Sequence, residues 1–115
     1  MDNQEKETLD RIHEQVTNNP VVIYMKGTPQ MPSCGFSSRT AQAMVETTEK
    51  FAFVNVLADP LIFEYLPKYQ DWPTFPQVYI GGELQGGCDI TLELAESGEL
   101  KTLMAKANEA VSEEA

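Results

Sequence analysis

One junction in the sequence constrains the fold of this chain more than any other stretch. The apolar run Val21–Met25 is followed by the loop Gly27–Ser33 and then by Cys34, where a helical spacing of apolar residues begins. An unbroken apolar run is typical of a strand buried on both faces of a sheet. A cysteine at the start of the next helix lies beside unpaired backbone N–H groups and the positive end of the helix dipole. That position lowers a thiol pKa from about 8.5 into the ~3.5–7.5 range, so the junction predicts a thiolate on a strand–loop–helix platform.

The charge balance narrows the choice of partners. The 115 residues include 18 acidic and 8 basic side chains, a formal net charge of −10. This excess repels phosphate backbones and anionic membrane surfaces, so we expect no nucleic acid and no membrane as a partner. The length favours a single domain over residues 1–110, followed by an acidic, disordered tail over 111–115. The start of the chain is polar and acidic, unlike a leader, and no apolar run approaches the ~20 residues that span a bilayer, so we expect a cytoplasmic protein.

The few cysteine and histidine residues exclude several kinds of site. Cys34 and Cys88 are the two cysteines, there is no C-x-x-C, and His13 is the single histidine. One chain therefore cannot assemble a secreted disulfide framework or a conventional zinc site. His13 lies on a helical stripe of apolar residues, and we interpret it as a partly buried packing residue rather than as the partner of a catalytic cysteine.

The remaining elements follow from periodicity and from turn and cap residues. They are a first helix up to Asn18, a helix from Phe36 to about Thr48, a strand Phe51–Val56, a helix capped by Asp59 with Pro60 after it, a hairpin of Gln77–Ile80 and Glu83–Gln85, a helix ending at Gly98, and a last amphipathic helix marked by Leu100, Leu103, Met104 and Ala107. The first two strands are joined through a helix and should be parallel. With the hairpin they make a four-stranded mixed sheet with helices on both faces, an α/β arrangement with the outline of a thioredoxin-like fold.

Five sequence features together resemble one family. Lys26, the loop with Pro32, Cys34-Gly35-Phe36-Ser37, Trp72-Pro73-Thr74-Phe75-Pro76 and Gly86-Gly87-Cys88-Asp89 occur in the order and spacing of the monothiol glutaredoxins of the C-G-F-S type. The resemblance covers about residues 5 to 108 and implies that Cys34 is the catalytic cysteine. Ser37 stands where a dithiol oxidoreductase has its second cysteine, and a hydroxyl cannot resolve a mixed disulfide by thiol attack.

The resemblance also implies a glutathione site with three parts. Lys26 would contact glutathione, although a strand-end lysine is commonly only solvated. Thr74, Phe75 and Pro76 would present backbone groups of Phe75 to glutathione, next to a cis Phe75–Pro76 bond facing Cys34. Gly87, Cys88 and Asp89 would hold the γ-glutamyl group at a helix start, Cys88 through its backbone rather than its sulfur. The alternatives are a plain N-cap for Asp89 and a buried packing role for Cys88.

One position departs from the family pattern. Members commonly place a basic residue within the segment that here is Pro60–Glu64, where it holds the glycine carboxylate of glutathione. This chain has Phe63 there. We therefore expect weaker anchoring at that end of glutathione, or a substitute contact from Lys26.

Counting ligands connects a single thiolate with an iron–sulfur cluster. A [2Fe–2S] cluster needs four ligands, normally thiolates, and one chain offers only Cys34 as a metal ligand. Two chains and two glutathione molecules complete the set, so we expect a homodimer bridged by one cluster, and the resemblance implies the same. It also implies a heterodimer with a BolA-like protein and delivery to apo iron–sulfur recipient proteins.

Three functions therefore remain open at this point. The favoured one is glutathione-dependent [2Fe–2S] cluster binding and transfer, in iron–sulfur assembly and iron homeostasis. The second is a glutathione-dependent thiol–disulfide oxidoreductase of low activity that acts on glutathionylated proteins. The third is a redox-regulated adaptor in which Cys34 and Cys88 pair, although the sequence does not give their separation.

Overall fold

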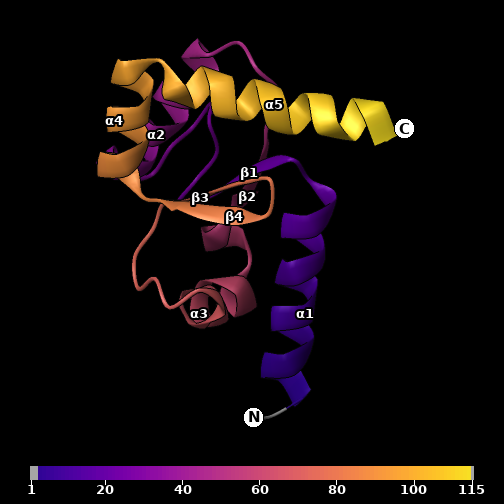
Figure 1. Ribbon diagram of the computed structural model, residues 1–115. Coiled ribbons are helices and arrows are strands. Elements are labelled where there is room, and N and C mark those ends of the chain that lie inside the picture. The colour runs from indigo at the N-terminus through magenta and orange to yellow at the C-terminus, as the bar shows by residue number, and fades with distance from the viewer. Residues whose placement is uncertain (1–2, 115) are drawn as a thin grey trace.

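The chain folds around a central four-stranded sheet (Figure 1). The computed structural model describes residues 3–114, and side chains over 3–110. The strands are β1 (Val21–Met25), β2 (Ala52–Asn55), β3 (Gln77–Ile80) and β4 (Glu83–Gly86), in the spatial order β2-β1-β3-β4. β1 is parallel to β2 and antiparallel to β3, and β3 and β4 form a hairpin, so the predicted mixed sheet is confirmed.

Helices cover both faces of this sheet. α1 (Asn3–Asn18) and α3 (Pro60–Tyr69) lie on one face, and α2 (Gly35–Glu46), α4 (Cys88–Ser97) and α5 (Glu99–Glu114) lie on the other (Figure 1). A short 3₁₀-helix, η1 (Val56–Ala58), joins β2 to α3. The arrangement confirms the predicted α/β class and thioredoxin-like fold.

β1 divides the core into two halves because its side chains alternate between the faces of the sheet. Val21, Ile23 and Met25 are buried against side chains of α2 and α5. Val22 and Tyr24 are buried against side chains of α1 and α3. All five residues of β1 are buried, as the unbroken apolar run predicts, and the end of this strand is fixed from both sides.

Two predicted boundaries are wrong by one or two residues. The strand predicted to reach Val56 ends at Asn55, because the Asn55 side chain caps a 3₁₀ turn by accepting a hydrogen bond from the Leu57 N–H at 3.0 Å. α2 ends at Glu46 rather than near Thr48, which lies beyond it with a positive φ of 65°.

The tail predicted over 111–115 falls on the last turn of α5 and on residue 115. No side chain is described there, so its boundary stays a prediction. Within residues 3–114, no helix combines the length and the apolar character needed to cross a membrane.

His13 corrects an expectation drawn from helical periodicity. Its side chain is exposed on α1 rather than partly buried. The ring nitrogen Nδ1 lies 2.8 Å from the Tyr69 hydroxyl, so the histidine joins α1 to the end of α3 by a polar contact. The apolar stripe of α1 is carried instead by Ile12 and Val16, which are buried.

Candidate functional site

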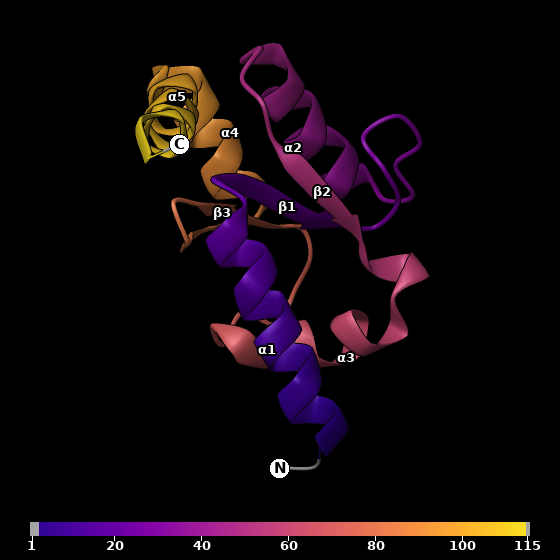
Figure 2. The ribbon, with the colours of Figure 1, turned by 90° about the vertical axis from the view of Figure 1, so that its right-hand side faces the viewer.

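The loop after β1 delivers Cys34 to the start of α2. The loop closes on itself, because the Ser33 N–H donates to the Lys26 carbonyl at 2.9 Å and the Met31 N–H donates to the Thr28 carbonyl at 3.1 Å. Gly27 has a φ of +94°, and a Cβ there would lie 2.5 Å from the Met31 carbonyl oxygen, so no other residue fits without a shift of backbone. Figure 2 shows this loop projecting beside the β1–α2 junction.

Cys34 is the N-cap residue of α2, with extended backbone angles and a partly exposed side chain. Its pKa lies below the usual value of a thiol, chiefly because the backbone N–H of Ser37 favours the anionic sulfur. Partial burial opposes this shift, while the Phe36 N–H, the Ser37 hydroxyl and the Lys26 ammonium add to it. The neutral sulfur closes no capping hydrogen bond of standard geometry, so these groups act on it as oriented dipoles and one charge. The predicted thiolate is thus favoured by the helix start.

Ser37 is fully buried behind the cysteine. Its Oγ accepts a hydrogen bond from the Lys26 N–H at 3.1 Å, which ties α2 to the end of β1. The hydroxyl proton remains available to the sulfur, consistent with the lowered Cys34 pKa. The side chain therefore supports the thiolate and supplies no second thiol.

An open groove with a volume of about 640 Å³ runs past Cys34, within the range of small-molecule sites. It is lined by Lys26, Cys34, Phe36, Phe63, Pro67, Trp72, Pro73, Thr74, Phe75, Pro76, Gly87, Cys88, Asp89 and Ile90. All eight residues that the sequence nominates for the site lie in this groove, although they come from four separate segments. Their individual roles remain predictions.

The floor of the groove is the segment before β3, which contains the cis Phe75–Pro76 bond that the resemblance implied. Gln77 is fully buried beneath it, and its Nε2 donates to the carbonyls of Trp72 at 2.8 Å and Thr74 at 3.2 Å. The Tyr79 hydroxyl donates to the Gln77 Oε1 at 2.8 Å. The Thr74–Phe75 peptide is trans, so its N–H points opposite to its carbonyl. Gln77 therefore turns the N–H of Phe75 away from the interior.

The far end of the groove is the start of α4. Gly87 is the N-cap, and a Cβ there would lie 3.2 Å from the Pro76 carbonyl oxygen. Asp89 is exposed in the first turn and is not the cap, so the plain N-cap alternative is wrong. Cys88 is buried, with 7% of its surface exposed. Unpaired N–H groups and the dipole make this helix start suited to an anion, with the Asp89 carboxylate beside it for a cation.

The opposite end is aromatic. The Phe63 ring on α3 lies 5.4 Å from the Phe75 ring between centroids, and the Lys26 Nζ lies 5.9 Å from the centre of the Phe63 ring. Phe63 thus occupies the wall where the family pattern leads one to expect a basic side chain.

Several contributors to the site escape prediction from the sequence. Pro67 and Ile90 line the groove, and Gln77 supports its floor. Pro67 and Ile90 follow apolar helical spacings typical of core residues, which hides their exposure. The sequence held a signal only for Gln77, because a polar residue at the start of an otherwise apolar strand indicates a side chain with a specific hydrogen-bonding role.

The described residues contain no group of three or more His, Cys, Asp or Glu side chains that could hold a metal ion. Both cysteines are free, and Cys34 is the more accessible of the two. A metal centre at Cys34 would therefore need ligands from beyond the described residues.

Comparison with known proteins finds a family model, curated relatives and solved structures that are similar to this chain. The family model described as Glutaredoxin matches residues 21–85. Glutaredoxin 4 from Haemophilus influenzae is 52% identical over 100 residues, which cover 87% of this chain and 94% of the relative. The solution structure of reduced poplar apo GrxS14 is 47% identical, with a TM-score of 0.70 over 89% of this chain and 91% of that one. A buckwheat glutaredoxin–glutathione complex has a TM-score of 0.82 at 24% identity, over 94% of this chain and 96% of that one, a likeness of fold.

Proposed function

The chain belongs to the glutaredoxin family, and we propose that within it the protein binds and transfers a [2Fe–2S] cluster with the help of glutathione. The observation that carries this proposal is a single activated thiol, Cys34, at the mouth of a ligand-sized groove, with the hydroxyl of Ser37 in place of a second thiol. A site of this kind can donate one sulfur to a metal and cannot close a disulfide within its own motif.

Glutathione fits the groove as an extended ligand. The outward N–H of Phe75 suits its central cysteinyl unit, which would lie beside the Cys34 sulfur as an added strand. The start of α4 suits the γ-glutamyl carboxylate, and the Asp89 carboxylate suits the ammonium of the same group. Lys26 offers the positive charge on the other side of Cys34. The same fold holds glutathione in the buckwheat complex.

The donor set favours a cluster shared between chains. Cys34 would hold one iron and the thiol of glutathione in the groove would supply the second ligand, so two such chains provide the four sulfurs of a [2Fe–2S] cluster. The cluster is the cargo in this scheme. Exposed apolar side chains in the loop before Cys34 and in the first turn of α2, Met31 at 78% and Phe36 at 54%, give two chains a surface to approach each other.

Protein partners would bind at the same surface, which contains the Cys34 sulfur and the exposed side chains of Met31 and Phe36. We propose a BolA-like protein as an alternative second subunit and apo iron–sulfur proteins as recipients, in the cytoplasm. Ligands held without covalent bonds to the chain would let the cluster leave readily.

A second candidate function is glutathione-dependent thiol–disulfide exchange, which the lowered Cys34 pKa also favours. The Cys34 thiolate would attack the glutathione sulfur of a glutathionylated protein and release that protein's thiolate. A second glutathione thiolate would then attack the mixed disulfide, releasing oxidised glutathione and restoring Cys34.

Anaerobic reconstitution separates the two candidates. The carrier is expected to gain visible cluster absorbance when iron, sulfide and glutathione are supplied together, and to lose it when glutathione is omitted or in Cys34→Ser. A protein that stays colourless but reduces a glutathione mixed disulfide at a useful rate without metal would favour the oxidoreductase instead.

A further inference from the structure

We infer that the α3 side of the groove does not select for a carboxylate, so that the site accepts γ-glutamyl-cysteinyl thiols ending in a neutral group about as well as glutathione. The inference rests on the proposed glutathione site and names the class of thiol that this site takes. It comes from the charges that face the groove and from the Phe63 ring.

The α3 side of the groove has little positive charge to offer an anion. Lys26 is the one Lys, Arg or His side chain among the described residues that line it. The nearby cations of α1 and α3 are engaged elsewhere: Arg11 makes two contacts with Asp59, at 2.8 and 3.2 Å, and the Lys68 Nζ lies 3.1 Å from a Glu5 carboxylate oxygen. Neither of these two side chains belongs to the lining of the groove.

The single ammonium of Lys26 also has a second task. Its charge contributes to the lowered pKa of Cys34, so it already faces an anion at the centre of the site. A ligand carboxylate would share that charge with the Cys34 thiolate, whether the sulfur is free or bound to a metal. Lys26 is half-buried in an open groove, and a pair that solvent still screens changes affinity by less than about fivefold.

The wall at this end is apolar instead. Phe63 is 42% exposed and packs against Phe75, with Pro67 and Trp72 also lining the groove. An alkyl or aromatic group on the third residue of the thiol would cover this surface and gain from the removal of apolar area from water. A carboxylate gains nothing from that contact.

The direct test is an amide NMR titration of the reduced, metal-free protein with two thiols. One is glutathione, and the other is its monoethyl ester at the glycine carboxyl group. The expected dissociation constants differ by less than about fivefold, with shifted amides at Phe75 and Asp89 for both ligands. A preference for glutathione of more than about fivefold would overturn the inference while leaving the glutathione site intact. Binding of neither thiol would overturn the proposed function, and the inference with it.

Two variants assign the effect to the aromatic wall. In Phe63→Arg the guanidinium can bind the glycine carboxylate of glutathione through charge-assisted hydrogen bonds, which the ester cannot form. The dissociation constant of the ester divided by that of glutathione should therefore rise about tenfold. Glu64→Gln makes the same change in net charge at the neighbouring, exposed residue, which does not line the groove, and should leave the ratio unchanged. An unchanged ratio in Phe63→Arg, or an equal rise in both variants, would contradict the assignment to Phe63.

Discussion

The hydroxyl of Ser37 shows how one buried atom can serve two neighbours. It accepts a hydrogen bond from the Lys26 N–H and thereby fixes the end of β1 against α2. Its proton points toward the Cys34 sulfur, where it favours the thiolate and lowers the Cys34 pKa. A thiol at the same place would accept the N–H bond poorly, because sulfur is a weak acceptor. The serine therefore gives up intramolecular exchange and retains support for the thiolate.

Replacing Ser37 by alanine should make the Cys34 thiol harder to ionise. The variant loses one of the contributions that lower the Cys34 pKa, so the pH midpoint of its alkylation by iodoacetamide should rise. At any pH near neutrality a smaller fraction of Cys34 is then thiolate. Ser33→Ala is the matched control, since the Ser33 side chain is exposed and only its backbone N–H is bonded. Equal midpoints in wild type and Ser37→Ala would contradict the assigned role.

Replacing Gln77 by leucine should weaken both the fold and the ligand site. The change leaves the carbonyls of Trp72 and Thr74 without their amide donor, which costs about 1–3 kcal/mol for a buried group left unpaired. It also frees the Thr74–Phe75 peptide to rotate, so glutathione affinity should fall in an NMR titration. Tyr79→Phe removes the other partner of Gln77 but keeps the amide on the loop. That variant should lose stability in urea unfolding but keep a glutathione affinity near that of wild type. Equal losses of affinity in both variants would contradict the role given to the hydrogen bonds from Gln77 to the loop.

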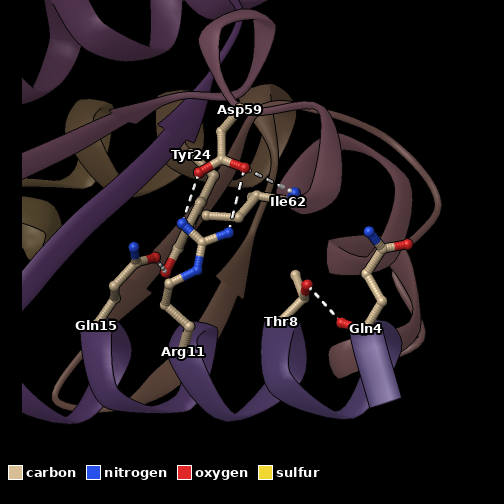
Figure 3. Close-up of polar contacts among 7 residues, drawn as sticks. All are labelled: Gln4, Thr8, Arg11, Gln15, Tyr24, Asp59 and Ile62. Atoms are coloured by element: carbon tan, nitrogen blue, oxygen red, sulfur yellow. Dashed lines mark hydrogen bonds and ion pairs between the residues drawn. The ribbon is translucent and has the colours of Figure 1, made fainter. Parts of the chain in front are cut away.

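The helix α3 carries Phe63 to the groove, and its start is held by Asp59. The carboxylate accepts from the Ile62 N–H at 3.2 Å as an N-cap and pairs with both terminal nitrogens of the Arg11 guanidinium on α1 (Figure 3). The pKa of Asp59 lies below its usual range, chiefly because of the Arg11 hydrogen bond. One side chain thus caps α3 and docks it on α1.

Asp59→Ala should lower the free energy of unfolding by about 1–2 kcal/mol at neutral pH, mostly through the lost cap. A carboxyl whose folded pKa is depressed stabilises the fold above its unfolded pKa of about 3.9, and that contribution fades as the pH falls through the folded pKa. The urea stabilities of wild type and variant should therefore converge in acid. Arg11→Ala, which keeps the cap, should cost less than about 1 kcal/mol because the pair is partly exposed. A larger loss in Arg11→Ala than in Asp59→Ala would show that the ion pair dominates.

The loop before Cys34 depends on one glycine. Gly27→Ala places a Cβ 2.5 Å from the Met31 carbonyl oxygen at a φ of +94°. The left-handed backbone alone costs about 1–2 kcal/mol, so thermal unfolding should show a clear loss, and the displaced loop should slow alkylation of Cys34. Gly35→Ala, where a Cβ meets nothing within 4 Å, should unfold near wild type. If both variants unfolded alike, the tight closure of the loop would be disproved.

The elements were predictable wherever a local rule decides them. Val21–Met25 is apolar throughout and is buried on both faces, and Asp59 with Pro60 starts α3 as its cap chemistry indicates. Prediction failed where a tertiary contact decides. Asn55 ends β2 early because its side chain also accepts the Gly27 N–H at 2.9 Å, a contact across 28 positions of the chain.

The same distinction applies to the groove. Its motif residues were named from the sequence, but the closeness of Phe63 to Lys26 and the support from Gln77 depend on how α3 and β3 pack. Helical periodicity predicted that His13 packs with the apolar stripe of α1, which faces α3. The His13 ring is instead exposed and contacts the Tyr69 hydroxyl at the surface.

Taken as a whole, the molecule concentrates its chemistry at one edge. The end of β1, the start of α2 and the start of α4 meet the loop before β3 at the groove, while α1 and α5 extend away from it toward the two ends of the chain (Figure 1). Met31, in the loop before Cys34, and Phe36, in the first turn of α2, leave apolar surface exposed. In the proposed assembly, a partner that covers this edge would shield a sulfur-bound metal from water, and each chain would contribute one thiolate to that metal.

The mass of the reconstituted assembly, measured under native conditions, tests this account most directly. We expect a particle of two chains with one [2Fe–2S] cluster and two glutathione molecules, and only metal-free monomer for Cys34→Ser. A cluster carried by a single chain, or a loaded dimer without glutathione, would contradict the account.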